Sequence, residues 1–257
     1  MSSLFEVDFA QPEGFRPLSL DLRTPESAGA PLIAFLHGGG WLRGSRKVFT
    51  PGISVARSFD RIVAAGFAVA SCEYRLSGEA RFPAQLDDVE AALTWLQAHA
   101  DEYGVDASRP VLWGVSAGAT LAALTGLRRR DVRGVVDWFG PADLFSMAEH
   151  DMGDAPEKTR EARWIGGPAA EHPEIARSAS PVRQVHAGAP PFHIAHGTAD
   201  AHVPFAQSQA LAAALQVVGA EVEFVPVEGG RHFWQGHPDT DPLFDAALAF
   251  CARVATR

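Results

Sequence analysis

The chain has 257 residues, a length that fits one hydrophobic core and therefore a single domain spanning 1–257. Apolar residues make up 47% of it and charged residues 21%, which is usual for globular proteins and excludes the disordered and fibrous classes. The formal charge of −9 disfavours binding to nucleic acids, whose phosphates attract basic proteins. No run approaches the ~20 apolar residues of a membrane span, so we expect neither a nucleic-acid nor a membrane partner.

The start of the chain and its cysteines bear on location and metal binding. The first 14 residues lack the basic start and apolar stretch of a secretory signal, which favours a cytoplasmic location. Cys72 and Cys251 lie far apart and have no metal-ligand spacing. We expect packed or free thiols rather than a disulfide, and no metal site.

The predicted elements begin with residues 18–23, where apolar and polar side chains alternate as in a half-exposed edge strand. After them, short apolar runs rich in β-branched or aromatic residues alternate with segments whose apolar residues recur every three or four positions. The runs predict buried strands and the periodic segments predict helices. In chain order these are strand 32–36, helix 53–65, strand 68–74, helix 83–100, strand 110–114, helix 117–127, strand 134–139, strand 192–196, helix 205–218, strand 222–227 and helix 242–254.

This alternation predicts the fold class. Strands that alternate with helices are joined by right-handed crossovers into a parallel sheet with helices on both faces, so the class is α/β. One region interrupts the pattern: residues 140–191 are rich in Pro, Gly, Ala and charged residues and have weak periodicity. Since irregular segments of this length are usually functional, we expect a small irregular cap or lid inserted into the single domain.

A serine between two glycines follows the strand predicted at 110–114. Residues 114–118, GVSAG, match the G-x-S-x-G turn that presents a nucleophile between a strand and a helix. The turn is so tight that its flanking positions favour glycine, and the hydroxyl of Ser116 stands at a helix N-terminus, where N–H groups favour negative charge. The alternative is that Ser116 only caps the helix.

A neutral serine needs a base, and the base needs an acid that orients it. In folds of this type an Asp or Glu and then a His follow the serine along the chain. Asp200 and His232 fit, since each follows the end of a predicted strand. His237 is the alternative base, further along the same loop, whereas His202 is too close in sequence to Asp200 to approach it from the other side.

A glycine-rich segment, HGGGW at 37–41, follows the strand predicted at 32–36. Consecutive glycines let backbone N–H groups turn toward a substrate oxygen, and such a loop pairs with the residue after the nucleophile to form an oxyanion hole. This assigns Gly38, Gly39 and Ala117 as donors. The alternative is a flexible surface turn, and phosphate binding is disfavoured because no P-loop motif is present.

Four aromatic residues are candidates for binding the substrate. Trp41 lies beside the glycine loop, Phe233 and Trp234 follow the predicted base, and Trp164 lies in the irregular segment. Together they could form an aromatic-lined pocket for the acyl or alcohol group; the alternative for each is a role in packing of the core or lid.

These motifs, in this order, resemble the α/β-hydrolase superfamily. The blocks are HGGGW, EYRLSGEARFPAQLDDVEAALTWL, GVSAG, HGTADAHVP and GGRHFW, and they cover the chain from about Leu18 to its end. The likeness is greatest to small bacterial esterases of the hormone-sensitive-lipase and carbohydrate-esterase type, which includes acetyl and feruloyl esterases. The resemblance implies Ser116 as nucleophile, Asp200 as acid and His232 as base.

The second block adds two structural residues and contains one of two departures. By the resemblance, Arg75 and Asp87 position the loop beside the glycines. Glu73 stands where Asp is usual before Tyr-Arg-Leu, and Ala119 stands where a glycine often follows G-x-S-x-G. Neither departure removes a catalytic group.

The sequence therefore predicts a serine carboxylesterase that hydrolyses short-chain esters and needs no metal or organic cofactor. Its expected partner is a small-molecule ester, and the sequence is also compatible with a homodimer. Three alternatives stay open: an amide-cleaving hydrolase of the arylformamidase or peptidase type, a non-catalytic ligand-binding relative, and a scaffold protein. The last does not explain why glycine-rich loops gather at one edge of the sheet.

Overall fold

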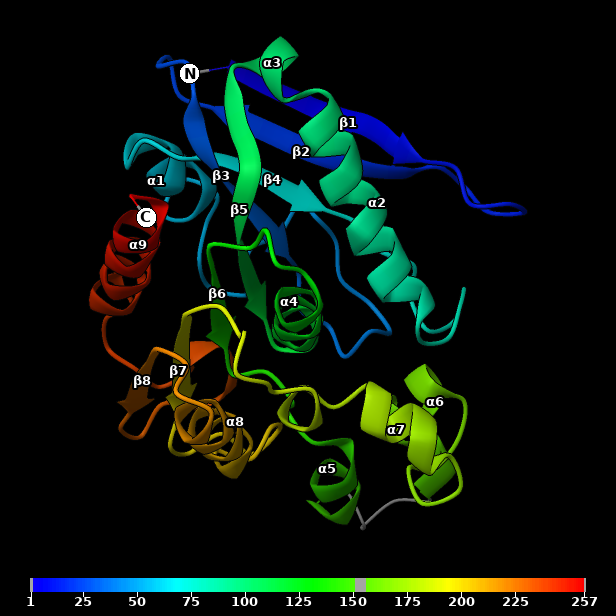
Figure 1. Ribbon diagram of the computed structural model, residues 1–257. Coiled ribbons are helices and arrows are strands. Elements are labelled where there is room, and N and C mark those ends of the chain that lie inside the picture. Colours follow the sequence, from blue (N-terminus) through cyan, green and yellow to red (C-terminus); the bar gives the residue numbers. More distant parts are fainter. Residues whose placement is uncertain (1, 151–155, 257) are drawn as a thin grey trace.

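The computed structural model describes residues 2–150 and 156–256 and contains an eight-stranded sheet (Figure 1). The strand order is β1-β2-β4-β3-β5-β6-β7-β8. β1 and β2, and β2 and β4, run antiparallel, and all other neighbours are parallel. The strands are β1 (Ser2–Ala10), β2 (Leu18–Thr24), β3 (Ala30–Leu36), β4 (Ala68–Cys72), β5 (Val105–Val115), β6 (Gly134–Trp138), β7 (Phe192–Gly197) and β8 (Val222–Val227).

Helices cover both faces of the sheet, which confirms the predicted α/β class. Side chains of α1 and α9 pack on one face, and those of α2, α4 and α8 pack on the other. The helices are α1 (Phe59–Ala64), α2 (Ala84–Ala98), α3 (Ala100–Tyr103), α4 (Ala117–Arg128), α5 (Leu144–His150), α6 (Arg160–Ile165), α7 (Pro173–Ser178), α8 (Ala206–Val217) and α9 (Asp241–Ala255), with 3₁₀ turns η1 (Pro156–Lys158), η2 (Pro181–Arg183) and η3 (His232–Trp234).

The sequence of the central strand β3 is apolar throughout because both of its faces are buried. Ile33 and Phe35 belong to the core under α1 and α9, whereas Leu32, Ala34 and Leu36 belong to the core on the opposite face. Successive side chains of a strand point to opposite faces, so a strand covered on both faces needs an unbroken apolar sequence.

The prediction of an edge strand at 18–23 is wrong. β2 lies inside the sheet between β1 and β4, and β1, which the sequence did not reveal, is the edge. Apolar and polar side chains do alternate in β2, but not because one face meets solvent. Leu18, Leu20 and Leu22 enter the core on one face. On the other face Asp21 is buried, and its Oδ1 lies 2.9 Å from Nε of Arg46. A buried ion pair, and not solvent, accounts for the polar position.

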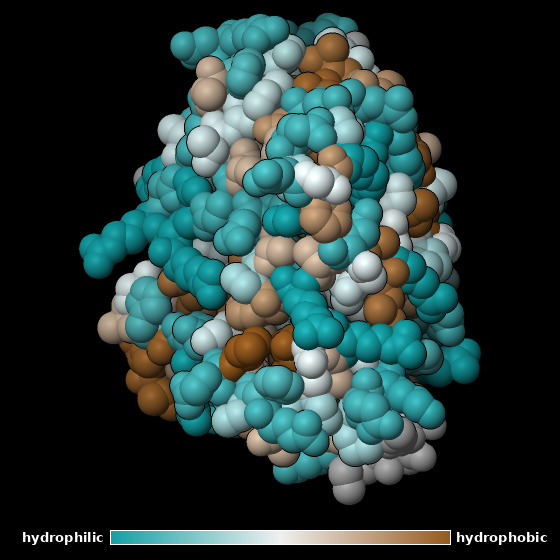
Figure 2. Space-filling view, turned by 90° about the vertical axis from the view of Figure 1, so that its right-hand side faces the viewer, coloured by the Kyte–Doolittle hydropathy of each residue, from teal (hydrophilic) through white to brown (hydrophobic). Residues whose placement is uncertain are grey.

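The segment 140–191 contains short helices in the part that the structure describes. α5 packs against α6 and α7, and η2 packs against α4 and α8. Figure 1 shows α5, α6 and α7 grouped together beyond α4. The side of the molecule that includes α2 and α6 is predominantly hydrophilic, with small separate hydrophobic patches (Figure 2). Apolar side chains are therefore concentrated inside the molecule, as a two-sided core requires.

The two cysteines are free thiols, as expected. Cys72 and Cys251 are both fully buried and belong to the cores on opposite faces of the sheet. Burial raises the pKa of the Cys72 thiol to about 12 and raises that of Cys251 as well, so both thiols are protonated at neutral pH.

Candidate active site

Ser116 occupies a strained turn between β5 and α4. Its backbone has φ 53° and ψ −125°, a conformation that few non-glycine residues adopt. A Cβ on Gly114 would lie 2.2 Å from the carbonyl oxygen of Gly118, and a Cβ on Gly118 would lie 2.1 Å from that of Leu36. Both glycines of G-x-S-x-G are therefore required by contact between backbones.

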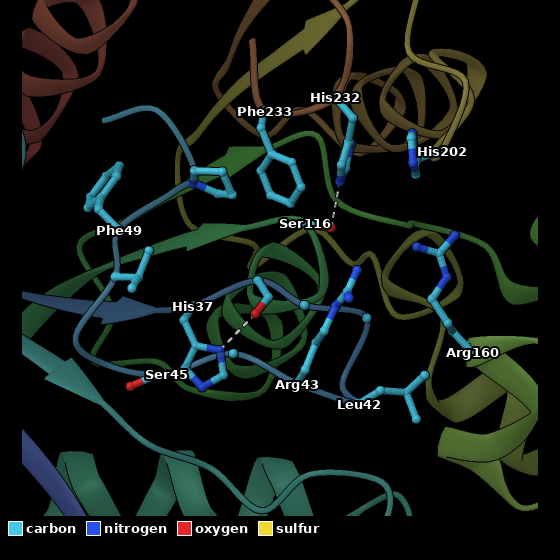
Figure 3. A pocket seen from close by; sticks show the side chains of 16 residues that line it. His37, Leu42, Arg43, Ser45, Phe49, Ser116, Arg160, His202, His232 and Phe233 are labelled. Carbon is cyan, nitrogen blue, oxygen red and sulfur yellow. Dashed lines mark hydrogen bonds between the residues drawn. The ribbon is translucent and has the colours of Figure 1, made fainter. Parts of the chain in front are cut away.

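Ser116, His232 and Asp200 form a hydrogen-bonded chain. The Ser116 hydroxyl lies 3.0 Å from Nε2 of His232 (Figure 3), and Nδ1 of His232 lies 2.6 Å from Oδ2 of Asp200. The other carboxylate oxygen of Asp200, Oδ1, accepts hydrogen bonds from the backbone N–H groups of His202 at 2.8 Å and Val203 at 3.0 Å. With Nδ1–H donating to the carboxylate, Nε2 is free to accept the serine proton.

The loops after β7 and β8 bring this acid and base together. The two strands are parallel neighbours, so both loops emerge at the same edge. The N–H of Ala199 donates to the carbonyl of Gly230 at 3.0 Å, and the N–H of Gly229 donates to Oγ1 of Thr198 at 2.9 Å. These backbone contacts hold the loops against each other and fix the register of Asp200 against His232.

Burial and neighbouring groups shift the pKa values of Asp200 and His232. Burial raises the pKa of the Asp200 carboxyl, but hydrogen bonds with His196 and His232 outweigh burial and hold it well below its usual range. Burial lowers the pKa of His232, and nearby His202 and His196 lower it further, against the opposing effect of Asp200. His232 is therefore a neutral base at neutral pH beside an ionised carboxylate.

The glycine loop after β3 lies against the nucleophile. A Cβ on Gly38 would lie 3.2 Å from Cβ of Ser116. The N–H groups of Gly38, Gly39 and Ala117 donate no hydrogen bond to any other residue that the structure describes. Unpaired N–H groups beside a nucleophile can donate hydrogen bonds to an oxyanion and so stabilise its negative charge.

His37 stabilises the glycine loop by ring stacking and hydrogen bonding. Its ring stacks on Tyr74 with centroids 4.3 Å apart, and its Nδ1 donates to the carbonyl of Gly38 at 2.8 Å. The Tyr74 hydroxyl donates to the carbonyl of His37, also at 2.8 Å. Burial lowers the pKa of His37 to about 4, so the ring is neutral and acts by packing and hydrogen bonding.

A pocket of about 520 Å³ opens above Ser116. Figure 3 shows its lining side chains, which come mainly from the loop after β3, from the start of α6 and from the loops after β7 and β8. Besides Ser116 and His232, its lining includes His37, Gly38, Gly39, Gly40, Leu42, Arg43, Gly44, Ser45, Val48, Phe49, Pro51, Arg160, His202 and Phe233.

Of the four aromatic residues proposed from the sequence to bind substrate, Phe233 lines this pocket and the three tryptophans do not. Trp41 and Trp164 are buried and stack on each other, with ring centroids 4.0 Å apart and planes 6° apart. Trp164 also donates from Nε1 to Oε1 of Gln85 at 2.9 Å. Trp234 packs into the core beneath the site. Trp41, Trp164 and Trp234 are thus packed among the core side chains of the described residues.

Two further expectations need comment. Arg75 pairs with Asp88, 2.7 Å from Nη2 to Oδ1, whereas Asp87, to which the resemblance assigned a structural role, is exposed. Asp88 is on the buried face of α2, whereas its neighbour points outward. His237, the alternative base, does not line the pocket.

Four polar residues of the pocket are not among the sequence-predicted site residues: Arg43, Ser45, Arg160 and His202. Arg43 and His202 lie close in sequence to motif residues, so proximity to HGGGW and to Asp200 was a usable signal. Arg160 lies in the irregular segment, where no pattern marks it.

Within residues 2–150 and 156–256, no group of three or more His, Cys, Asp or Glu side chains is arranged to hold a metal ion. In the same part of the chain, no helix combines the length and the apolar character needed to cross a membrane.

Comparison with curated proteins finds esterases. The chain is 29% identical over 217 residues to esterase LipC of Mycobacterium tuberculosis (strain ATCC 25618 / H37Rv), covering 79% of this chain and 53% of LipC. It is 32% identical over 241 residues to esterase LipQ of the same strain, covering 85% of this chain and 55% of LipQ. The chain thus spans about half the length of these relatives.

Solved structures share the whole fold. A truncated form of a carbohydrate esterase from gut microbiota superimposes with a TM-score of 0.86 and 28% identity, covering 100% of this chain and 97% of that one. The sheet topology and this neighbour confirm the α/β-hydrolase fold. The BD-FAE family model matches residues 20–215, which include the glycine loop, Ser116 and Asp200. The chain belongs to the BD-FAE family.

Proposed function

We propose that the protein is a serine carboxylesterase that hydrolyses short-chain carboxylic esters through an acyl-enzyme. The observation that carries the proposal is the chain of two hydrogen bonds from the Ser116 hydroxyl through His232 to Asp200, at 3.0 Å and 2.6 Å. The esterases LipC and LipQ, which this chain resembles, support the same activity.

In this mechanism Ser116 attacks the ester carbonyl while Nε2 of His232 takes the hydroxyl proton. Asp200 holds the ring in the required tautomer and stabilises the imidazolium that forms. The carbonyl oxygen becomes an oxyanion that accepts the N–H groups of Gly38, Gly39 and Ala117, which have no other partner among the described residues. His232 then gives its proton to the leaving alcohol.

The second half of the reaction uses the same groups. A water molecule gives a proton to Nε2 of His232 and attacks the acyl carbon bound to Ser116. The tetrahedral intermediate collapses, the serine oxygen takes back the proton, and the carboxylic acid leaves. Every proton passes through His232, so no metal or organic cofactor is required by this scheme.

The preference for short chains follows from the size and lining of the pocket. A volume of about 520 Å³ accommodates a small ester, and its apolar lining, which includes Leu42, Val48, Phe49 and Phe233, suits a short acyl or alkyl group. The segment 140–191, which contributes Arg160 to the pocket, would act as a small cap over it. The cytoplasmic location and the homodimer also stay predictions.

The test is turnover of p-nitrophenyl acetate and butyrate by the wild-type chain and by Ser116→Ala. We expect the variant to lose at least about 10³-fold in kcat while keeping the wild-type thermal transition. Fluorophosphonate labelling, which requires an activated serine, should occur in the wild type and be absent in the variant. Wild-type activity in a folded Ser116→Ala would disprove the mechanism. N-formylkynurenine, run in parallel, tests the amide-cleaving alternative.

A further inference from the structure

Two arginines, and no carboxylate of the described residues, line the pocket above Ser116. Arg43 lines it from the loop after β3, and Arg160 lines it from the first residue of α6. None of the described residues that line this pocket is Asp or Glu. The whole chain has a formal charge of −9, so this local positive charge is opposite in sign to the average charge of the molecule.

Both guanidinium groups lack a partner among the described residues: no carboxylate lies within 4.0 Å of either, and no side chain or carbonyl accepts a hydrogen bond from them. Some other arginines of this chain are paired, such as Arg133, whose Nη2 lies 2.9 Å from Asp106, and others, such as Arg128 and Arg130, are exposed on the surface. A guanidinium is charged at any physiological pH and has five N–H donors in one plane. Arg43 and Arg160 are therefore available to an anion that enters the pocket.

The position of Arg160 is built into the glycine loop. A Cβ on Gly40 would lie 2.6 Å from Cδ of Arg160 and 3.4 Å from its Cγ, so the stem of Arg160 rests on the bare Cα of Gly40. Gly40 has φ +61°, which favours glycine independently. The third glycine of HGGGW thus makes room for a side chain that arrives from α6.

Arg43 is tied to the same loop. Its backbone N–H donates to the carbonyl of Gly39 at 3.2 Å, in a turn so tight that a Cβ on Gly39 would lie 1.9 Å from the Arg43 carbonyl oxygen. In Figure 3 the side chain of Arg43 extends from this loop and that of Arg160 extends from α6, and both line the pocket that contains Ser116. The backbone of Arg43 and the stem of Arg160 therefore both lie against the loop that carries the proposed oxyanion donors.

We propose that the preferred substrates are esters that carry a carboxylate, which Arg43 and Arg160 bind while the ester carbonyl lies at Ser116. The inference rests on the proposed esterase function. Arginine and carboxylate match in geometry, because two N–H groups of the fork meet the two oxygens. The carboxylate of the substrate would neutralise the positive charge of Arg43 and Arg160, which no described carboxylate of the pocket compensates. It can belong to the acyl or to the alcohol half of the ester, and the two sources are separated by experiment.

Two matched pairs of esters serve as probes. Phenyl hemiadipate and phenyl adipamate differ only by a carboxylate or a carboxamide at the end of the acyl chain. The second pair, 4-acetoxybenzoate and 4-acetoxybenzamide, differs in the same way on the leaving group. For each ester the spontaneous rate is subtracted, and kcat/KM is divided by the rate constant for hydroxide hydrolysis to remove intrinsic reactivity.

In one of the pairs we expect the anionic ester to be preferred by at least about tenfold at low ionic strength, since a charged hydrogen bond contributes about this much. Arg43→Gln and Arg160→Gln should each reduce the preference several-fold, and the double variant should bring it close to one. The ratio is measured within one preparation, so a change in the folded fraction cancels. Arg130→Gln, an exposed arginine at the end of α4, is the matched control and should keep the wild-type ratio.

The outcomes separate this inference from the proposed function. A ratio near one in both pairs, with the neutral esters hydrolysed, overturns the inference and leaves the esterase intact. A preference that survives the double variant also overturns it, because the anion would be recognised elsewhere. If no ester is hydrolysed and no fluorophosphonate labels Ser116, the proposed function fails and the inference fails with it. A preference in one pair that the two arginine variants abolish supports it and identifies the half of the ester that bears the charge.

Discussion

Gly197, the last residue of β7, lies directly against Gly230 in the loop after β8. A Cβ on Gly197 would lie 2.1 Å from the carbonyl oxygen of Gly230. Asp200 follows the first of these glycines by three residues and His232 follows the second by two. The distance of 2.6 Å between Asp200 and His232 therefore depends on a close approach of two backbones that only glycine permits.

Gly197→Ala should separate the two loops. The new methyl group would meet backbone atoms that cannot rotate away, so we expect a loss of about 1–3 kcal/mol in the free energy of unfolding and a fall in kcat larger than the fall in folded fraction. Gly78→Ala is the matched control, because a Cβ there has no atom within 4 Å. Urea unfolding and kcat per folded molecule measure both. Equal behaviour of the two variants would show that the contact does not position the acid and base.

The identity of the triad residues could be predicted because its determinants are local in sequence. A glycine-flanked serine after a strand, and an Asp and a His after later strands, follow from topology, since parallel strands deliver their carboxyl ends to one edge. The backbone angles could not be predicted. Phe233 and Trp234, directly after His232, have φ of 58° and 62°, and nothing in their residue types indicates a left-handed conformation.

Esterase activity should fall on the acid side with a midpoint below pH 6.5. The base His232 must be neutral to accept the serine proton, and burial, with His202 and His196, lowers its pKa from the ordinary value of 6.5. Activity is therefore present above the shifted pKa and is lost as the pH falls through it. The measurement is kcat/KM against pH with a neutral aryl ester. A midpoint above 6.5 would contradict the direction of this shift.

His202→Gln should move that midpoint upward, toward 6.5. The two rings stack with centroids 5.3 Å apart, and the charge of a protonated His202 opposes protonation of His232. Glutamine removes the charge and keeps a polar side chain at the rim. A control with His186→Gln, an exposed histidine whose ring is hydrogen-bonded to the carbonyl of Leu127 near the C-terminal end of α4, should leave the midpoint in place. An unchanged midpoint in His202→Gln would show that His202 does not lower the pKa of His232.

Asp88→Asn should destabilise the fold, and Asp87→Asn should not. Asp88 is 3% exposed, and its carboxylate accepts hydrogen bonds from the side chain of Arg75 and from its backbone N–H, the latter at 2.8 Å. Losing one partner of a buried pair leaves the other uncompensated, and because Arg75 reaches solvent we expect a loss of about 2 kcal/mol. The exposed Asp87 should change stability by less than about 0.5 kcal/mol. Chemical denaturation of both variants checks the assignment; similar losses would refute it.

The resemblance assigned the structural role to Asp87 and not to Asp88, because adjacent aspartates cannot be distinguished by motif alone. On a helix, successive residues point about 100° apart, so one of two neighbours faces the core and the other faces solvent. The same limit explains why the burial of Trp41 and Trp164 could not be predicted. Trp41 follows the glycine loop and Trp164 lies in the segment 140–191, but their stacking on each other is a long-range contact that no local pattern encodes.

Composition also could not show β1 or the place of β2. The side chains of β1 are mostly exposed, so it has no apolar run to mark it. The charged position Asp21 of β2 looked solvent-facing because its partner Arg46 follows the glycine loop, in a distant part of the sequence. Pairing between remote polar residues is invisible to periodicity, which registers only the apolar face of an element.

Asp137→Asn should stabilise the protein above neutral pH. Asp137 is 1% exposed at the end of β6 and accepts the N–H of Gly140 at 2.9 Å. Burial raises its pKa from the ordinary 3.8 to about 6, against the opposing effects of Gly140 and His196. Since the folded pKa is the higher one, the stabilising contribution is present below pH 3.8 and is lost as the pH rises through about 6.

Asparagine keeps the acceptor for Gly140 without ionising, so it removes this loss. The difference in free energy of unfolding between Asp137→Asn and the wild type should therefore grow from pH 4 to pH 8, by on the order of 2 kcal/mol. Urea unfolding of both proteins at several pH values measures it. The matched control is Asp8→Asn, on the exposed part of β1, whose difference from the wild type should not grow over the same range. A difference for Asp137→Asn that shrinks with rising pH would mean that this carboxylate is stabilised in the fold, and that the buried end of β6 is a more polar environment than its contacts indicate.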